Sequence, residues 1–461
     1  MAIENNNKTL NHSVKREQSE FTHFAESENE RGASLLNVPN KREQSQTRLG
    51  YAERKEQSPQ GNIPNLRFPE FSGEWDRIKV SDLLEFYPTN SLSWEQLDYS
   101  GEGIFNLHYG LIHKGLPTQV DVSENNLPTI KDEYIPKKMS LCQNGDVAFA
   151  DASEDTNDVA KCIEFANCDE KKIVCGLHTI HGRGTQNKTV TGYKGYAFSA
   201  RPFREQIRRL AQGTKIYSIN SHNFSECYIG IPCKEEQSKI SNLLHRVDLR
   251  IATQIKIIEK LESLIRGISN NLLYSESGTP VRLGDILSER LERTKVNNQH
   301  EVLSSTVKGI FSQREYFSKD IASENNVGYK VIRLHDVVLS PQNLWMGNIN
   351  YNDKFDIGIV SPSYKIFSIA DSYDKRFVAA MLKTHRALYN YMLVSEQGAS
   401  VVRRNLNMEA FEQLVFKMPS IDKQREIGNA ISALQSRLEL AVRVKTAYEK
   451  QKQWLLTEMF I

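Results

Sequence analysis

The sequence contains one unit twice, and this tandem duplication limits the possible fold more than any other feature. Residues 224–240 align with residues 411–427 without a gap. In that alignment Phe, Pro, Gln and Ile recur at equivalent positions, and nearly all apolar positions match. Upstream, Gly145-Asp-Val parallels His335-Asp-Val. Since an internal repeat in sequence marks a repeated structural unit, we expect two copies of one mixed α/β globule, each followed by a proline and a long helix.

A chain of 461 residues is long enough for two or three domains. The duplication suggests five segments. They are a polar tail over 1–62, a first globule over 63–235, a first long helix over 236–276, a second globule over 277–420 and a second long helix over 421–461.

Both long helices carry a sustained apolar repeat with alternating steps of four and three residues. Such a 3.5-residue period keeps one apolar edge facing a partner helix, as in a coiled coil. A compact domain seldom needs a straight helix of this length, so packing of each helix on its own globule explains the pattern less well. The repeat includes Ile251, Ile258, Leu261 and Ile265 in the first helix, and Leu434, Leu438, Tyr448 and Leu455 in the second.

The globules are expected to contain short strands and amphipathic helices. Residues 146–150 and 337–340 are β-type runs, and residues 203–212 and 377–392 have helical periodicity. The segment 194–215 holds six Lys or Arg against one acid. Within it Arg204, Arg208 and Arg209 are candidate phosphate contacts, although a solvated helix face explains the same charges equally well.

Residues 1–62 are rich in Asn, Gln, Ser and charged side chains and poor in large apolar ones. Such a segment buries too little apolar surface to offset its ordering entropy, so we expect it to be disordered.

Composition favours a cytoplasmic protein without a membrane segment. No apolar run reaches the roughly 18 residues of a membrane-spanning helix, and the first residues lack the apolar core of a signal peptide. The spacing of Cys175, His178 and His181 could form part of a zinc site. No C-x-x-C pair accompanies it and the segment is predicted to be strand and loop, so we expect no metal and no disulfide.

Motifs for catalysis are missing from the sequence. It contains no Pro-Pro dipeptide of an adenine methyltransferase tetrapeptide, no phosphate-binding Gly-x-x-x-x-Gly-Lys-Ser/Thr loop, no Gly-x-Ser-x-Gly and no His-Glu-x-x-His. We therefore expect a non-enzymatic chain that binds no cofactor.

The duplicated plan resembles the specificity subunits of type I restriction-modification systems. The resemblance covers about residues 63–461 and rests on the order of several short segments, each of low specificity alone. They are Leu66-Arg-Phe-Pro-Glu-Phe-Ser-Gly-Glu-Trp75, the Gly-Asp-Val and His-Asp-Val pair, the loops beginning Gln212-Gly-Thr and Gln397-Gly-Ala, Val360-Ser-Pro-Ser-Tyr364, and the prolines Pro232 and Pro419 before the long helices.

The resemblance implies an α+β fold in which each globule is a target-recognition domain that reads one half of a bipartite, asymmetric site in double-stranded DNA. It implies that the two long helices pack as an antiparallel coiled coil, which acts as a spacer and docks two methyltransferase subunits. Those partners would carry S-adenosylmethionine. Whether restriction subunits with ATP and Mg²⁺ also join is left open.

Base-reading residues are expected on loops with Arg, Lys, Asn, Gln or Ser, where glycine permits close approach. The two Gln-Gly loops fit this description, although their glycines could serve only as turn residues. The candidates are Thr214, Lys215, Arg183, Gln342, Asn343, Gln397, Ser400, Arg403 and Arg404.

Two other functions remain open from the sequence. A stand-alone regulator with two DNA-binding modules would bind its site tightly without partners. A coiled-coil scaffold without DNA binding would show none of the salt-dependent DNA affinity that phosphate contacts produce.

Overall fold

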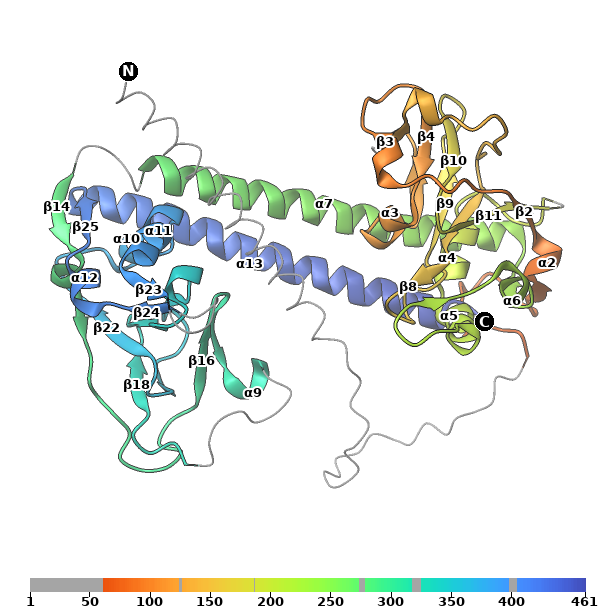
Figure 1. The fold of residues 1–461 in the computed structure, drawn as a ribbon. Helices are drawn as coiled ribbons and strands as arrows, with labels where there is room; N and C mark the ends of the chain where they lie inside the picture. The colour runs from red at the N-terminus through yellow and green to blue at the C-terminus, as the bar shows by residue number, and fades with distance from the viewer. Residues whose placement is uncertain (1–60, 124–126, 186, 273–277, 317–324, 398–403) are drawn as a thin grey trace, which may run out of the picture. The chain divides into compact units, whose positions relative to one another are not determined.

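The computed structural model describes residues 61–123, 127–185, 187–272, 278–316, 325–397 and 404–461 (Figure 1). The expected tail over 1–62 lies almost entirely outside the described residues. By their internal contacts the described residues form two compact units. The N-terminal unit comprises the residues up to Lys260 together with Leu438–Ile461, and the C-terminal unit comprises Leu261–Arg437.

The N-terminal unit begins with a strand that pairs with the last strand before the long helix. β1 (Asp76–Lys79) runs antiparallel to β13 (Tyr228–Ile231), and the short helix α2 (Val80–Leu83) leads into the main sheet. That sheet has the order β2 (Leu84–Tyr87), β11 (Thr179–Gly184), β7 (Val147–Ala150), β9 (Cys162–Ala166) and β5 (Gln119–Asp121). A second sheet has the order β10 (Lys172–Cys175), β4 (Ile104–Leu107), β6 (Thr129–Ile130) and β3 (Leu97–Asp98).

The other elements of the N-terminal unit are short. β8 (Ala152–Ser153) pairs with β12 (Tyr217–Ser218). The helices are η1 (Trp94–Gln96), α3 (Tyr109–His113), η2 (Asp132–Tyr134), α4 (Tyr193–Ser199), α5 (Arg201–Leu210) and α6 (Ser221–Ser225).

The C-terminal unit repeats this plan. β14 (Thr279–Arg282) runs antiparallel to β25 (Val415–Met418), and α8 (Leu283–Ile286) leads into the main sheet. That sheet has the order β15 (Leu287–Glu289), β22 (Lys365–Ile369), β19 (Val337–Leu339) and β20 (Ile349–Tyr351). The remaining strand pairs are β16 (Leu303–Thr306) with β17 (Gly309–Ser312), β18 (Lys330–Arg333) with β21 (Ile357–Val360), and β23 (Ser395–Gln397) with β24 (Arg404–Leu406). The helices are α9 (Gln313–Tyr316), η3 (Leu344–Met346), α10 (Lys375–Leu382), α11 (His385–Leu393) and α12 (Met408–Glu412).

The duplicated sequence segments occupy equivalent places in the two units. Asp146 and Asp336 are both buried directly before β7 and β19. The residue before each aspartate, Gly145 or His335, has a left-handed backbone with φ of 83° or 73°. The matched sequence Gly/His-Asp-Val therefore encodes the same turn into the same central strand, and the expected duplication of structure is confirmed.

The expected single helix over 377–392 is wrong, because this stretch forms the two helices α10 and α11. Thr384 lies between them with an extended backbone, and its hydroxyl accepts a hydrogen bond from the amide of Ala387. This N-cap starts a new helix. The other expected elements are confirmed: β7 and β19 match the predicted strands, and α5 buries Phe203 and Ile207.

The two long helices are α7 (Lys234–Leu272) and α13 (Ile421–Glu458) (Figure 1). At 1.5 Å per residue each is about 58 Å long. The predicted 3.5-residue repeat coincides with the least exposed positions: Ile251, Ile258, Leu261, Ile265, Leu434, Leu438 and Tyr448 are half-buried, and Leu455 is buried. The flanking positions are mostly exposed, so each helix has one preferred packing edge.

Within the N-terminal unit the two helices pack antiparallel. Lys452 on α13 lies 2.6 Å from the carboxylate of Asp248 on α7, and Arg250, further along α7, donates to the hydroxyl of Tyr448, further back on α13. The end of α13 enters the core of this unit, where Leu455 and Phe460 belong to the same cluster as Trp75. None of the helices in the described part of the chain combines the length and apolar character needed to cross a lipid bilayer.

Candidate nucleic-acid interface

The loop that carries Thr214 and Lys215 projects from the N-terminal unit. Gln212 and Ser218 close its base by exchanging two backbone hydrogen bonds, at 3.0 and 2.8 Å. The residues between them, except Tyr217, are exposed, including the apolar side chain of Ile216. An exposed lysine on a short closed loop can reach a ligand surface without rearranging the sheet.

Gly213 is required by the shape of this loop. Its φ is 140°, which side chains rarely permit, and a Cβ at this position would lie 1.9 Å from the carbonyl oxygen of Ile216. The glycine is therefore more than a generic turn residue, because it sets the direction of the chain into Thr214 and Lys215.

The three arginines of α5 do not share one environment. Arg204 does not point outward as expected: its Nη2 donates to the backbone carbonyl of Asn157 at 2.6 Å, and burial lowers its pKa to about 10. Arg208 is exposed and its Nη1 donates to the Asn157 side chain at 3.3 Å. Arg209 is exposed. A cation on such a helix can contact phosphate only where its guanidinium is accessible, which favours Arg208 and Arg209.

Arg183 on β11 forms several hydrogen bonds within the N-terminal unit. Its guanidinium donates twice to the buried carboxylate of Asp146, at 2.9 and 2.7 Å, and once to the carbonyl of Leu141. It also lies over the ring of Tyr87, 4.5 Å from its centroid. The hydrogen bonds to Asp146 raise the pKa of Arg183. The side chain is partly accessible, so it keeps one face for a ligand.

The C-terminal unit brings together two candidate segments that are far apart in the sequence. The backbone amide of Arg404 donates to the carbonyl of Gln342 at 3.2 Å. The Arg404 guanidinium lies 5.3 Å from the ring centroid of Trp345. Gln342 and Gln397 are exposed, and Asn343 is half-buried. Ser400 and Arg403 lie outside the described residues.

The arginine–tryptophan pair was not predicted from the sequence. The separation of Trp345 and Arg404 along the chain carries no signal for this contact, and Trp345 alone is equally consistent with a core residue. The exposure of Ile216 in the same loop as Lys215 was not predicted either.

Comparison with known proteins gives these surfaces a context. A family model described as type I restriction modification DNA specificity domain matches residues 74–263. No curated protein sequence matches the chain. Among solved structures, the type I restriction-modification system S subunit from M. genitalium has a TM-score of 0.54 at 14 % identity, covering 87 % of this chain and 99 % of that one. This likeness concerns the fold.

Two further solved structures are similar over much of their length. A structure of a type I R-M system, described by its complex assembly and conformational transition, has a TM-score of 0.44 at 13 % identity, with 83 % and 96 % coverage. The HsdS subunit from Thermoanaerobacter tengcongensis has a TM-score of 0.34 at 14 % identity, with 83 % and 95 % coverage.

The matched domain lies in the first of two equivalent units, and each unit is followed by a long helix. Residues 74–263 therefore match a type I restriction modification DNA specificity domain, and the fold of the chain is similar to that of a type I S subunit.

Proposed function

We propose that the chain reads a bipartite, asymmetric DNA site, with one half-site contacted by each unit. The observation that carries this proposal is the equivalence of the two units: four strands in the same order in the main sheet, a buried aspartate before the equivalent strand of that sheet, and a long helix after the last strand. Two copies of one recognition domain with different loops would read two different half-sites. We propose residues 63–235 and 277–420 as the two recognition domains, each of which can be replaced by the corresponding domain of another specificity subunit.

Base reading is proposed for the following positions of each unit. In the N-terminal unit these positions are Thr214, Lys215 and Arg183; in the C-terminal unit they are Gln342, Asn343, Gln397, Ser400, Arg403 and Arg404. Arginine and lysine pair with guanine, and asparagine and glutamine pair with adenine, in the major groove. Arg204, Arg208 and Arg209 are proposed as phosphate contacts, and Arg204 would have to leave Asn157 to act in this way.

The long helices are proposed as the docking surface for two methyltransferase subunits. In the N-terminal unit the helices expose a set of large apolar side chains: Leu249, Ile255, Ile257, Leu440, Val442 and Trp454. Exposed apolar residues on a helix pair suit a partner that packs helices against them. S-adenosylmethionine would be bound by those partners, and ATP and Mg²⁺ by restriction subunits where these join.

An exchange of recognition domains tests the proposal. Residues 63–235 are replaced by the corresponding segment of another specificity subunit, and methylated adenines are mapped by sequencing DNA from cells that carry the hybrid. One half of the methylated motif should change. The matched exchange of residues 277–420 should change the other half. Both halves changing with a single exchange, or neither, would contradict independent reading.

A further inference from the structure

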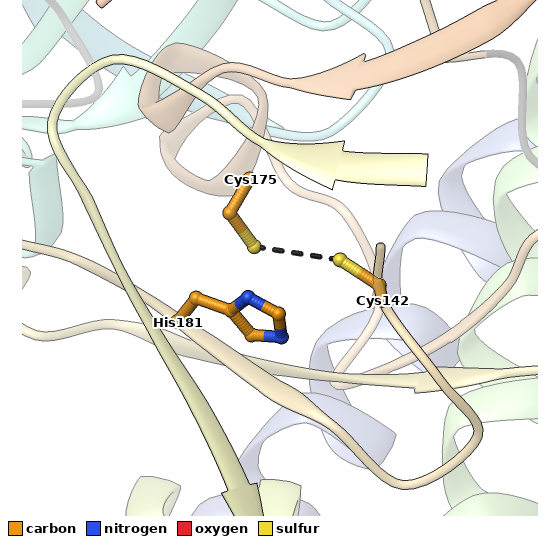
Figure 2. Close-up of side chains that lie close together, drawn as sticks. All are labelled: Cys142, Cys175 and His181. Carbon is orange, nitrogen blue, oxygen red and sulfur yellow. Dashed lines mark hydrogen bonds between the residues drawn. The ribbon is translucent and has the colours of Figure 1, made fainter. Parts of the chain in front are cut away.

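Three buried side chains that can bind a metal ion lie together in the N-terminal unit. They are Cys142, Cys175 and His181, and their candidate ligand atoms all lie within 4.8 Å of one another. The two sulfur atoms are 3.7 Å apart, and the imidazole of His181 lies beside both (Figure 2). All three side chains are buried, and both cysteines are free thiols.

The backbone holds these residues in place from two sheets. Cys175 ends β10 in the four-stranded sheet, and the amide of Cys142 donates to the carbonyl of Ile173 in the same strand at 2.8 Å. His181 lies in the middle of β11 in the five-stranded sheet. The cluster therefore joins the two sheets of this unit.

His181 is oriented for metal binding by a hydrogen bond on its far nitrogen. Nε2 lies 2.8 Å from the buried carboxylate of Asp146. Because a carboxylate can only accept, Nε2 carries the proton and Nδ1 has a free lone pair. Nδ1 is buried and has no hydrogen-bond partner. An imidazole that donates one N–H to a carboxylate and offers its other nitrogen is the usual arrangement of a histidine metal ligand.

This cluster differs from the one considered in the sequence. His178 takes no part in it, because its ring faces the carboxylate of Asp151 at 3.1 Å and is half-exposed. Cys142 occupies the place that His178 was considered for. Cys142 lies 33 residues before Cys175, which is no recognisable metal-ligand spacing, so the sequence did not indicate it as a ligand.

We propose that Cys142, Cys175 and His181 bind a zinc ion that links the two sheets of the N-terminal unit. Two sulfurs and an imidazole nitrogen form a ligand set that favours tetrahedral Zn²⁺.

Charge supports the loaded site. On binding, each thiol releases its proton to solvent, so that Zn²⁺ and two thiolates are together neutral. The remaining charges, on Asp146 and Arg183, already form an ion pair at 2.7 Å. The buried site is thus neutral both with and without the ion, and binding leaves no uncompensated charge in the core.

The full-length chain, purified under reducing conditions and dialysed free of metal, tests the site. The protein is titrated first with Co²⁺ and then with Zn²⁺ while the absorbance spectrum is recorded. Bound zinc is measured by inductively coupled plasma mass spectrometry. Cys142→Ala and Cys175→Ala are compared with Cys162→Ala, which removes another buried thiol of the same unit from the apolar core. Circular dichroism checks that each variant is folded.

The wild type and Cys162→Ala should bind one Co²⁺ per chain with a thiolate charge-transfer band, and Zn²⁺ should abolish the band. Cys142→Ala and Cys175→Ala should lose the band and at least tenfold in Zn²⁺ affinity. The titration of the wild type tests the proposal even if a variant misfolds. If the reduced wild type binds no metal, the proposal is overturned. Equal binding by all four chains, or a Cys142–Cys175 disulfide in place of metal in the isolated protein, would overturn it as well.

Discussion

The side-chain amide of Gln237 donates a hydrogen bond to the backbone carbonyl of Pro232 at 2.8 Å, at the point where the last strand passes into α7. Gln424 makes the same bond to Pro419 at 2.8 Å before α13. The carbonyl oxygen of Gln237 accepts from the amide of Val190, and that of Gln424 from the amide of Asp374. The repeated Pro and Gln thus connect the start of each long helix to another segment of the same unit. In the N-terminal unit this segment lies just before α4, and in the C-terminal unit it lies just before α10.

Gln237→Ala should destabilise the protein. Gln237 is fully buried, so its removal leaves the Val190 amide and two carbonyls without partners, at a cost of about 1–3 kcal/mol. Urea unfolding followed by circular dichroism measures the change. Ser238→Ala, at the neighbouring half-buried position, should change stability by less than about 0.5 kcal/mol. Equal effects of the two substitutions would argue against this role of Gln237.

Arg209→Gln should weaken binding of the assembled methyltransferase to DNA and make that binding less salt-dependent, because Arg209 is exposed and proposed as a phosphate contact. Loss of one phosphate contact lowers the slope of log affinity against log salt by about 1. Fluorescence anisotropy at several salt concentrations measures the slope. Lys256→Gln, on the exposed face of α7, serves as the charge-matched control. An unchanged slope with altered motif specificity would assign Arg209 to a base instead of a phosphate.

Gly213→Ala should reduce DNA affinity without lowering stability by the same proportion. The new Cβ would overlap the Ile216 carbonyl, so the exposed loop has to adopt another path. The sheet below it need not change. DNA binding and urea unfolding are measured on the same preparation. Gly267→Ala, where a Cβ meets no atom within 4 Å, is the control, and the loop's role is refuted if both alanines bind DNA as the wild type does.

The Asp248–Lys452 pair should stabilise the antiparallel contact of α7 and α13 in the N-terminal unit. Both side chains are mostly buried, and Lys452 also donates to Thr118 while Asp248 accepts from Tyr196. A double-mutant cycle with Asp248→Asn and Lys452→Met, measured by urea unfolding, should give a coupling of about 1–3 kcal/mol. Additive effects would mean that packing alone holds the helices there.

Asp336 should contribute more to the free energy of unfolding in mild acid than at neutral pH. Burial raises the pKa of this carboxyl, against opposing hydrogen bonds from the Arg333 amide and Arg290. The folded state therefore binds its proton more tightly than the unfolded state, whose aspartate pKa is about 3.9. Its contribution is complete below that pH and falls as pH rises through the higher folded pKa.

The variant Asp336→Asn removes this titration. The stability of the wild type minus that of Asp336→Asn should become more favourable between pH 7 and pH 3, measured by urea unfolding. Asp371→Asn, whose side chain is 97 % exposed, is the control and should show no comparable trend. A difference that moves in the opposite direction would show that the ion pairs of Asp336 outweigh its burial.

The sequence by itself determined the duplication, the two long helices and the edge on which each helix packs. These features depend on local periodicity: an apolar residue every 3.5 positions makes one helix edge apolar wherever the helix lies. The matched segments before β7 and β19 could be predicted for the same reason, since Gly145 or His335 and the following aspartate form a local turn.

Contacts between distant segments were decided only by the tertiary structure. The sequence indicated exposed arginines on α5, but Arg204 found an acceptor in Asn157, 47 residues earlier. It showed Trp345 and Arg404 separately, and it considered Cys175 and His181 together with His178 instead of with Cys142. Such contacts depend on which strands become neighbours in a sheet. The order of the strands depends on how whole faces of the sheet are buried, and short spacings in the sequence do not contain this information.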